Sequence, residues 1–276
     1  MRLVTLAPDL RVPALGQGTW RMGEVPSRAG AETAAIREGV ALGLSLIDTA
    51  EMYGDGETET FLGKALEGLR DQVFLVSKVY PQNAGGARLE RACEASLRRL
   101  KTDRLDLYLL HWRGSIPLAE TVRGLEALVA AGKIRSWGVS NLDTDDMEEL
   151  VEAGGAACVT DQILYNVTRR GPEFDLLPDL ARRGMTAMAY SPVEQGRLPR
   201  TGALAEVGRR HGVSAYQVAL AWALRRPEVI AIPKAATLAH VRDNRAAADL
   251  ILSDEDLALI DAGFPPPRRK SALDML

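Results

Sequence analysis

Short apolar runs alternate with helical patterns along almost the whole chain, and this alternation constrains the fold more than any other feature of the sequence. Runs such as "LSLID", "VFLVSK" and "LDLYLL" are too short and too uniformly apolar for strands that are exposed on one face. They are typical of strands buried on both faces of a parallel sheet. The pattern predicts eight strands, at Val12–Gly18, Leu44–Asp48, Val73–Lys78, Leu105–His111, Ile134–Ser140, Ala157–Gln162, Thr186–Tyr190 and Val229–Pro233.

Stretches with a helical period lie between these predicted strands. In residues 88–100, Leu89, Cys93 and Leu97 fall on one stripe while Glu90 and Glu94 face away, as in a helix packed on a sheet. Acidic residues around Thr144 favour the start of another helix at that position. The other predicted helices are Ser27–Leu42, Glu57–Leu69, Thr121–Ala131, Leu176–Arg183, Ala203–Arg210, Ala215–Leu224 and Leu238–Ala248, besides Arg88–Leu100 described above.

Eight strands separated by helices, without a long linker, predict an α/β protein with one closed (β/α)8 TIM barrel over residues 1–276. We expect a short β-segment before the barrel and an extended tail after it, starting at Pro265–Pro267. The basic residues Arg268–Lys270 in that tail predict a solvated surface patch. A doubly wound open sheet is the alternative that the alternation alone leaves open.

Composition excludes several classes of protein. The formal net charge is −3, and nucleic acid as a main partner would require a clustered basic surface. There is no apolar run of the roughly 18 residues that cross a membrane, and residues 1–12 lack an apolar signal core. The only cysteines, Cys93 and Cys158, predict buried thiols in a reducing compartment. We therefore expect a cytoplasmic monomer with a small-molecule partner.

Polar residues recur where the predicted strands end. In a barrel these ends open on one face, which is where such enzymes place their chemistry. A single polar residue at a strand end is unremarkable, but a series of them predicts a site. The residues in question are Asp48, Lys78, His111, Ser140, Asn141, Gln162, Tyr190, Ser191 and Lys234.

Asp48, Tyr53, Lys78 and His111 form a chemically coherent set. Reducing a carbonyl group by hydride transfer leaves an alkoxide, so a proton must arrive together with the hydride. An ammonium beside a tyrosine stabilises the phenolate and lowers the tyrosine pKa from about 10, while a carboxylate keeps the ammonium charged. A histidine can donate to the carbonyl oxygen and orient it. The set predicts a proton-delivery site in which Tyr53 is the acid.

The segments that carry these residues resemble those of the aldo-keto reductase family: "LIDTAEMYGDGETE", "VSKV" and "DLYLLHW" resemble its catalytic segments. "GQGTW", "KIRSWGVSN", "DQILYN", "MAYSPV" and "IPKAATLAHVRDN" resemble other blocks of the family, in the family's order. The resemblance covers nearly the whole chain. The stretches "GTWRMGE", "FLVSKVYPQNAGG" and "ALDML" look especially similar to a bacterial subgroup that includes a methylglyoxal reductase.

The resemblance implies a role for each matching residue. Tyr53 would be the general acid, Lys78 and Asp48 its tuning pair, and His111 the donor that orients the carbonyl. Ser140, Asn141 and Gln162 would bind the nicotinamide carboxamide, and Tyr190 would stack on the nicotinamide ring. The other implied cofactor residues are Thr19, Trp20, Ser191, Pro192, Lys234, His240 and Asn244, and the implied pocket walls are Trp20, Met22, Met52 and Trp112.

The expected cofactor is NADPH, with NADH possible. Family members that prefer NADPH commonly hold its 2′-phosphate with a Lys-Ser pair and an arginine five residues beyond it. This chain keeps Lys234 but has Ala235 for the serine and His240 for the arginine, so Arg242 or Arg245 would have to compensate. "GQG" lacks the third glycine of a Rossmann fingerprint, which agrees with a family that binds its dinucleotide without that fold.

Short connections near the site predict a small or open pocket, so small aldehydes and α-dicarbonyls such as methylglyoxal are the first substrate candidates. A second hypothesis is a non-catalytic, cofactor-binding regulatory subunit on the same barrel. A third is an unrelated metal-dependent barrel. It would need a convergent cluster of histidine and carboxylate ligands, and the chain has 3 histidines, so no metal site is expected.

Overall fold

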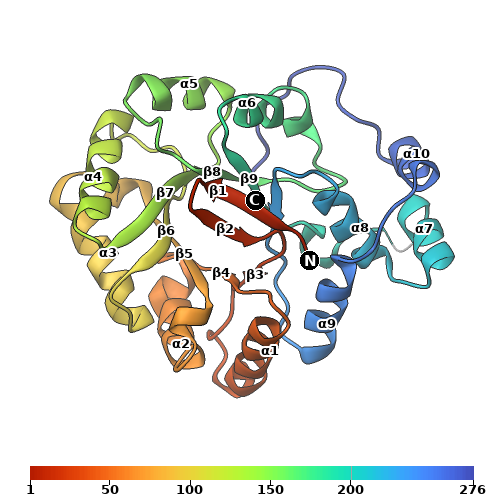
Figure 1. Ribbon diagram of the computed structural model, residues 1–276, viewed down its shortest axis with the longest axis horizontal. Helices are drawn as coiled ribbons and strands as arrows, with labels where there is room; N and C mark the ends of the chain where they lie inside the picture. The colour runs from red at the N-terminus through yellow and green to blue at the C-terminus, as the bar shows by residue number, and fades with distance from the viewer. Residues whose placement is uncertain (200) are drawn as a thin grey trace.

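The computed structural model describes residues 1–199 and 201–276 and contains a parallel barrel at its centre (Figure 1). Its strands are β3 (Gln17–Gly18), β4 (Leu46–Asp48), β5 (Phe74–Val79), β6 (Leu105–Leu110), β7 (Ile134–Ser140), β8 (Thr160–Leu164), β9 (Thr186–Tyr190) and β10 (Val229–Ala231), which pair in chain order. Gly16 N donates to Ala231 O at 2.9 Å and Gly18 N to Pro233 O at 3.1 Å. These bonds join the first strand to the last, so the predicted closed barrel is confirmed over an open sheet.

Helices surround the barrel (Figure 1). They are α1 (Ala29–Ala41), α2 (Glu57–Ala65), α3 (Gly86–Leu100), α4 (Leu118–Ala130), α5 (Thr144–Glu152), α6 (Leu176–Arg182), α7 (Ala203–His211), α8 (Ala215–Leu224), α9 (Leu238–Ala247) and α10 (Asp254–Gly263). The short 3-10 helices are η1 (Pro26–Arg28), η2 (Tyr53–Gly56), η3 (Arg70–Gln72), η4 (Pro81–Asn83), η5 (Gly171–Glu173) and η6 (Glu194–Gly196). Predicted helix ends differ from these bounds most at Glu57–Leu69, whose helix ends at Ala65.

Helix α10 is absent from the sequence prediction. It begins with a capping box between Ser253 and Asp256, but only Asp256 and Ile260 are buried in it. Asp256 accepts a bond from His211 Nε2 of α7 at 2.7 Å, so α10 packs on another helix instead of on the sheet. A helix that buries so little has a weak apolar stripe, and periodicity does not reveal it.

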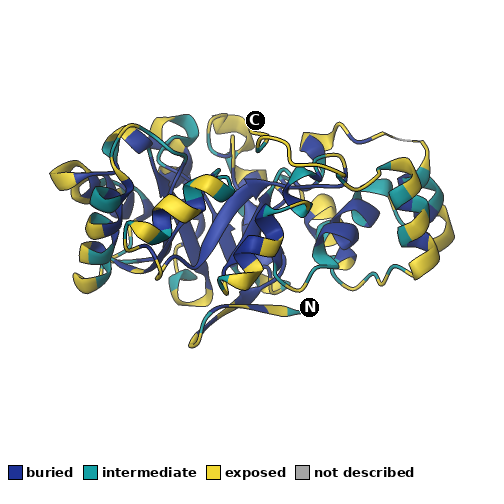
Figure 2. Cartoon of the chain, turned by 90° about the horizontal axis from the view of Figure 1, so that it is seen from above, coloured by how far each residue is buried: buried dark blue, intermediate teal, exposed yellow. Residues whose placement is uncertain are grey.

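The prediction for Val12–Gly18 is wrong in its extent. Val12 belongs to β2 (Leu10–Pro13), which pairs antiparallel with β1 (Leu3–Ala7) in a hairpin before the barrel. Leu6 and Val12 pack with barrel residues such as Phe74 because the hairpin covers one end of the barrel. Figure 2 shows the hairpin at one face of the molecule and the C-terminus at the opposite face.

The barrel strands are buried on both faces, as their sequence pattern predicts. All residues of β5 and β6 are buried, and Figure 2 shows the strands as the buried centre of the molecule. Cys93 and Cys158 are buried free thiols. Within the described residues, none of the helices combines the length and apolar character needed to span a bilayer.

Residues 264–276, here called the C-terminal tail, follow α10 without a helix or strand. The tail is held by ion pairs from Lys270 to Asp145 and Asp175, at 3.2 and 3.3 Å, and from Arg169 to Asp274 at 3.4 Å. The prediction of an irregular tail is confirmed. The prediction of a solvated surface patch is confirmed, because residues 268–270 are all exposed, and Lys270 in addition pairs with two carboxylates from separate elements.

Candidate active site

The ammonium group of Lys78 lies at the centre of the candidate site, fully buried near the end of β5. Its nitrogen donates to Asp48 Oδ1 at 2.8 Å, to the carbonyl oxygen of Thr49 at 2.8 Å and to the hydroxyl oxygen of Tyr53 at 3.1 Å. An ammonium has three N–H donors, so these acceptors use all of them. These distances confirm that Asp48, Tyr53 and Lys78 converge as the sequence predicts.

Asp48 fixes the charge of the lysine. Its Oδ1 faces Lys78, while its Oδ2 accepts a bond from Gln162 Nε2 at 2.8 Å. Burial would by itself lower the pKa of Lys78, but Asp48 and, to a smaller extent, Tyr53 outweigh it and raise that pKa above its ordinary value. Lys78 therefore remains an ammonium at neutral pH.

Tyr53 starts the irregular turn that joins β4 to α2. Gly54, Asp55 and Gly56 have φ values of 56°, 50° and 91°, which is left-handed backbone. Glycine adopts this region freely and aspartate tolerates it, so the "GDG" segment suits the turn. The turn places the Tyr53 ring centre 4.8 Å from Lys78 Nζ. Since the phenol oxygen accepts from Lys78, its own hydrogen remains available to donate.

The pKa of Tyr53 differs in direction from the sequence prediction. Burial raises it, and although the Lys78 ammonium lowers it, the net pKa lies above the ordinary value of a tyrosine. Desolvation therefore outweighs the nearby cation in this structure, and the predicted lowering is wrong as a net effect. The phenol keeps its proton at neutral pH, which is the state that a proton donor requires.

His111 follows β6 and is 7% exposed. Its ring lies edge-to-face with that of Tyr53, with 6.0 Å between the ring centres. Burial, assisted by the charge of Lys78, lowers the pKa of His111 to about 2. The imidazole is therefore neutral and has one N–H to donate. This state fits a residue that orients a carbonyl oxygen.

The lowered pKa of His111 predicts a pH-dependent stability. The unfolded chain binds a proton on this histidine below a pH of about 6.5, whereas the folded chain does not until much lower pH. Stability should therefore decrease as the pH falls below about 6.5, by up to about 1.4 kcal/mol per pH unit. Urea unfolding at several pH values should show a shallower slope for His111→Gln than for the wild type, and identical slopes would contradict this.

The residues expected to hold the nicotinamide form a connected group at the ends of β7, β8 and β9. Asn141 Nδ2 donates to the carbonyl oxygen of His111 at 3.2 Å and to Ser140 Oγ at 3.0 Å. The Tyr190 hydroxyl donates to Asn141 Oδ1 at 3.0 Å. Gln162 is 2% exposed and its amide nitrogen is bonded to Asp48, which leaves its carbonyl oxygen for a ligand. The half-buried ring of Tyr190 is thus fixed beside Asp48, Tyr53, Lys78 and His111, which we call the tetrad.

The other expected cofactor residues lie in different settings. Thr19 is fully buried and its hydroxyl donates to the carbonyl oxygen of Asp48 at 2.8 Å, so it lies beneath the site instead of on its surface. Ser191 follows β9 with a φ of 46°, and Pro192 is buried beside it. Lys234 follows β10 and forms a parallel β-bridge with Gly18 of β3. His240 is exposed and Asn244 half-buried, both on α9.

The two arginines considered as substitutes for the missing arginine are engaged elsewhere. Arg242 Nε donates to Glu38 Oε1 at 2.7 Å, and the guanidinium of Arg245 donates through Nη1 to Asp249 Oδ2 at 2.6 Å. Lys234, in contrast, has no ion-pair partner among residues 1–199 and 201–276. An exposed, unpaired lysine at a strand end suits a phosphate group.

Of the predicted pocket walls, Met22 is contradicted by the structure, and the other three stay predictions. Trp20 is 40% exposed and Met52 and Trp112 are half-buried, so all three have surface to offer. Met22 is wrong as a wall, because it is fully buried and packs in the core with residues such as Phe61. The position of Met22 in a loop next to Trp20 gave no indication that its side chain points inward.

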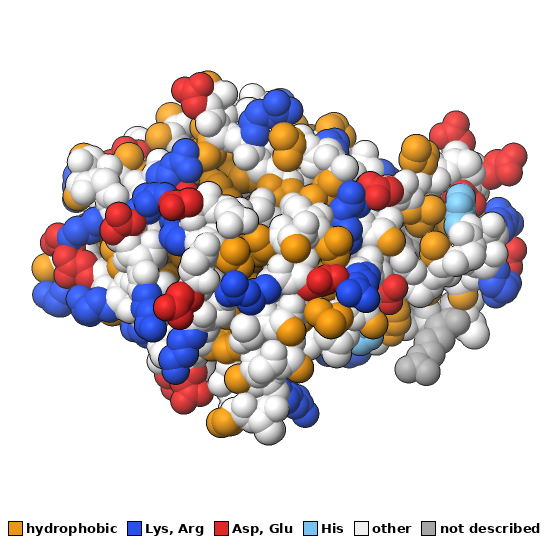
Figure 3. All heavy atoms as spheres, turned by 60° about the horizontal axis from the view of Figure 1, so that its bottom comes forward, with side chains coloured by type: hydrophobic (Ala, Val, Ile, Leu, Met, Phe, Trp, Pro, Cys, Tyr) orange, Lys and Arg blue, Asp and Glu red, His pale blue; other side chains and the backbone are white. Residues whose placement is uncertain are grey.

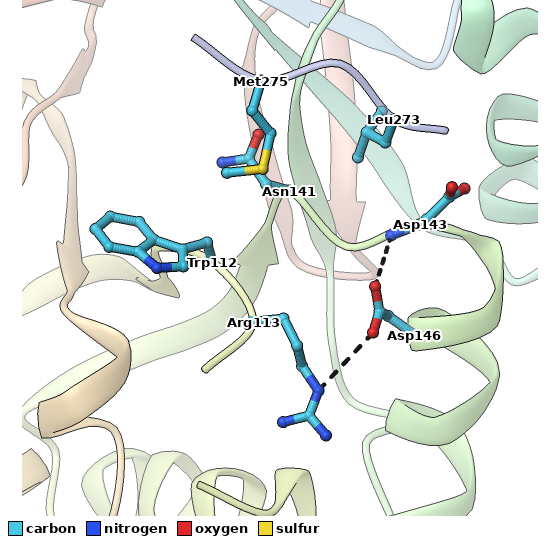
Figure 4. Close-up of a pocket in the computed structure, with 7 residues that line it drawn as sticks. All are labelled: Trp112, Arg113, Asn141, Asp143, Asp146, Leu273 and Met275. Carbon is cyan, nitrogen blue, oxygen red and sulfur yellow. Dashed lines mark hydrogen bonds and ion pairs between the residues drawn. The ribbon is translucent and has the colours of Figure 1, made fainter. Parts of the chain in front are cut away.

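A cavity of about 280 Å³ lies beside Trp112, the residue that follows His111 (Figure 4). It is lined by Trp112, Arg113, Asn141, Asp143, Asp146, Leu273 and Met275. Figure 4 shows Leu273 and Met275 of the C-terminal tail opposite Trp112. The Trp112 ring centre is 4.8 Å from that of His111 and 5.8 Å from that of Tyr80.

Sequence reasoning missed several of these residues. The contribution of Thr49 is a backbone carbonyl, and residue type does not reveal it. The tail residues Leu273 and Met275 follow a basic stretch that points to solvent. The available signals were their apolar character and the resemblance of the segment "ALDML" that contains them. In the described part of the chain, no group of three or more His, Cys, Asp or Glu side chains could hold a metal ion.

Comparisons with known proteins agree with this geometry. Residues 14–263 match the family model described as the aldo/keto reductase family. The chain is 53% identical to the methylglyoxal reductase YeaE of Escherichia coli, covering 100% of this chain and 99% of that one. It is 32% identical to the glyoxal reductase of Bacillus subtilis, covering 94% and 91%. An aldo/keto reductase from Klebsiella pneumoniae, solved with NADP and acetate, superimposes with a TM-score of 0.97 at 52% identity, covering 99% of both chains.

The family is thus shown by a match over most of the chain and by a relative of similar length. The barrel, the position of the tetrad at the ends of its strands and the order of the sequence blocks all agree with it. The chain belongs to the aldo-keto reductase family.

Proposed function

We propose that this protein reduces small aldehydes and α-dicarbonyls to alcohols with NADPH, with methylglyoxal as the first candidate substrate. The observation that carries the proposal is the geometry at Lys78. Because its ammonium donates to the hydroxyl oxygen of Tyr53, the phenol hydrogen is free for a substrate oxygen. The names of the relatives support a dicarbonyl substrate, and the cavity beside Trp112, of about 280 Å³, is suited to a small molecule.

The residues of the chain fit a nicotinamide cofactor. Tyr190 presents a half-buried ring that Asn141 holds in place, and Lys234 is an exposed cation at the end of β10. When bound, NADPH would supply the hydride. Lys234 would hold its 2′-phosphate, and Tyr190 would fix which face of the nicotinamide meets the substrate.

Three side chains have separate roles in the reduction, those of Tyr53, Lys78 and His111. His111, as a neutral donor, orients the carbonyl oxygen toward the phenol. Tyr53 releases its proton to that oxygen as the carbonyl carbon becomes bonded to hydrogen, which leaves a phenolate on Tyr53. Lys78, held charged by Asp48, stabilises this phenolate at the moment it forms. The phenolate is reprotonated from solvent before the next turnover.

A panel of carbonyl compounds with purified protein tests the proposal. Oxidation of NADPH should be fastest with methylglyoxal and other small aldehydes and slow with bulky ketones. Turnover of bulky ketones with no activity on methylglyoxal would contradict the substrate class. Tight binding of NADPH without turnover of any carbonyl would favour the regulatory subunit that the sequence left as an alternative.

Lys234 is expected to set the preference for NADPH over NADH. Because Arg242 and Arg245 are paired with carboxylates, Lys234 is the cation available for the 2′-phosphate. A charge-assisted hydrogen bond of about 1.5–3 kcal/mol implies that Lys234→Met lowers kcat/KM for NADPH roughly tenfold or more and leaves that for NADH unchanged. Initial rates with both cofactors measure this, and a higher kcat/KM of the wild type with NADH would overturn the preference.

We further propose that residues 1–276 act as one barrel domain, as a cytoplasmic monomer that does not bind nucleic acid. Figure 3 supports the last point for the face it shows, because positive and negative side chains are interspersed over it. The free thiols of Cys93 and Cys158 support a reducing compartment. Light scattering should give a mass near 29.9 kDa, and a multiple of that mass would contradict a monomer.

A further inference from the structure

A buried polar network lies directly behind the turn that carries Tyr53. Glu59 of α2 is fully buried. Its Oε2 accepts from Arg99 Nε of α3 at 2.6 Å, and its Oε1 accepts from Ser77 Oγ of β5 at 2.6 Å. We refer to Arg99, Glu59 and Ser77 as the Glu59 network. It joins two helices to the strand that bears the catalytic lysine.

The network includes the residue before Lys78 and packs on the turn that starts at Tyr53, so it reaches both partners of the proton-delivery pair through their neighbours in the chain. Ser77 precedes Lys78 on β5, so their side chains point to opposite faces, Ser77 toward the helices and Lys78 into the barrel. At the other end, a Cβ atom added to Gly56 would meet the Cδ and Nε atoms of Arg99 at 2.7 Å. The Arg99 side chain therefore packs directly on the turn that starts at Tyr53.

This turn needs support from its surroundings. Gly54, Asp55 and Gly56 are all left-handed, and such backbone persists where neighbouring structure holds it. Besides Glu59, the first turn of α2 is held by Thr58, whose hydroxyl donates to the carbonyl oxygen of Met22 at 2.8 Å. Of these contacts, only the Glu59 network leads to the strand of Lys78.

We infer that Glu59 is a positioning residue, which fixes the phenol of Tyr53 at bonding distance from the ammonium of Lys78 by joining the Tyr53 turn to β5. The inference rests on the proposed reductase function for its kinetic consequences. The inferred effect of Glu59 on the distance between Tyr53 and Lys78 does not depend on that function. Glu59 acts through Tyr53 and Lys78 and need not touch the substrate.

Glu59→Gln is the first test variant, because the glutamine keeps the shape and an acceptor for Ser77 but loses the ion pair with Arg99. Displacement of a catalytic group by about 1 Å can cost up to roughly 100-fold in rate, so kcat should fall at least about tenfold while KM for NADPH stays the same. Glu173→Gln is the matched control. Glu173 also pairs with arginines, Arg170 and Arg225, through a side chain that is 6% exposed, on an element that has no bond to the Tyr53 turn. This control should lose stability and retain kcat.

Ser77→Ala is the second variant, and it cuts only the link to β5 without changing a charge. Because Lys78 lowers the pKa of Tyr53, a longer distance between them should raise that pKa, which NMR of ¹³C-labelled tyrosine measures without any turnover. The Tyr53 signal is assigned with Tyr53→Phe.

The inference is overturned if Glu59→Gln and Ser77→Ala both keep the wild-type kcat and the wild-type titration of Tyr53. It is also overturned if Glu173→Gln shifts that titration equally, because the effect would then be general destabilisation. A wild-type protein without reductase activity would instead remove the proposed function, and the titrations would still decide whether Glu59 positions Tyr53.

Discussion

Tyr53→Phe is expected to lower kcat for carbonyl reduction by roughly 10²- to 10⁴-fold, the contribution typical of a positioned general acid. The substitution removes one oxygen atom, which is bonded to Lys78 at 3.1 Å, and leaves the ring in place beside His111. Without the phenol, the alkoxide that forms on hydride transfer receives no proton from the protein. NADPH binding should be retained, because the residues proposed to hold the cofactor are unchanged.

Steady-state kinetics with methylglyoxal and fluorescence titration with NADPH measure the two quantities separately. Tyr190→Phe is a useful control, since it also removes one tyrosine hydroxyl near the site but cuts the bond to Asn141 and leaves Lys78 with all its partners. It should affect cofactor binding more than kcat. Wild-type kcat in Tyr53→Phe would show that another group delivers the proton.

Lys78→Met is expected to cost both stability and activity. The side chain of Lys78 is fully buried, and its removal leaves the carboxylate of Asp48 buried without its partner cation. Breaking one side of a buried ion pair typically costs about 3–5 kcal/mol. The pKa of Tyr53 should rise as well, because the one nearby cation that lowers it is lost.

Urea unfolding and kcat measurements on Lys78→Met, Asp48→Asn and the double variant test this pair. The double variant should recover part of the stability, since neither charge then remains unpaired, but it should stay inactive. An unchanged unfolding midpoint in Lys78→Met would mean that Asp48 does not depend on the lysine. Recovery of activity in the double variant would exclude Lys78 from the chemistry.

Much of the barrel could be predicted because a strand buried on both faces has a recognisable, almost continuously apolar sequence. "LDLYLL" and "VFLVSK" are apolar throughout, and both form fully buried strands. The first barrel strand was harder to predict, because Val12 and Leu15 are both apolar but pack in different places. Val12 packs with the N-terminal hairpin, and Leu15 packs near α1 and α9. Periodicity does not distinguish two short elements that follow each other without a break.

Most of the tetrad could be predicted because Asp48, Lys78 and His111 place ionisable groups where apolar strands end, whereas Tyr53 lies in the turn after β4. Lys78 after "FLVS" requires a partner, and Asp48 supplies it. The direction of the Tyr53 pKa could not be predicted in this way. It depends on how deeply the phenol is buried relative to its distance from Lys78, and both are tertiary properties.

The sequence pattern also did not predict the Glu59 network or the part of the C-terminal tail that lines the cavity. Glu59 stands in the segment "GETETF" among other polar residues, where nothing separates a buried glutamate from an exposed one. Leu273 and Met275 line the cavity in a tail whose Lys270 and Asp274 form ion pairs with residues far away in the sequence. Contacts of this kind arise from the folded path of the chain and leave no local periodicity.

Transfer of deuterium from labelled cofactor to product tests the central claim most directly. Methylglyoxal is reduced with NADPH carrying deuterium on either face of nicotinamide C4, and the product is analysed by mass spectrometry and NMR. We expect the wild type to place deuterium from one face only on the former carbonyl carbon, and Tyr53→Phe to do so far more slowly. Product without deuterium from either face, or equal rates in the two proteins, would contradict hydride transfer coupled to proton donation by Tyr53.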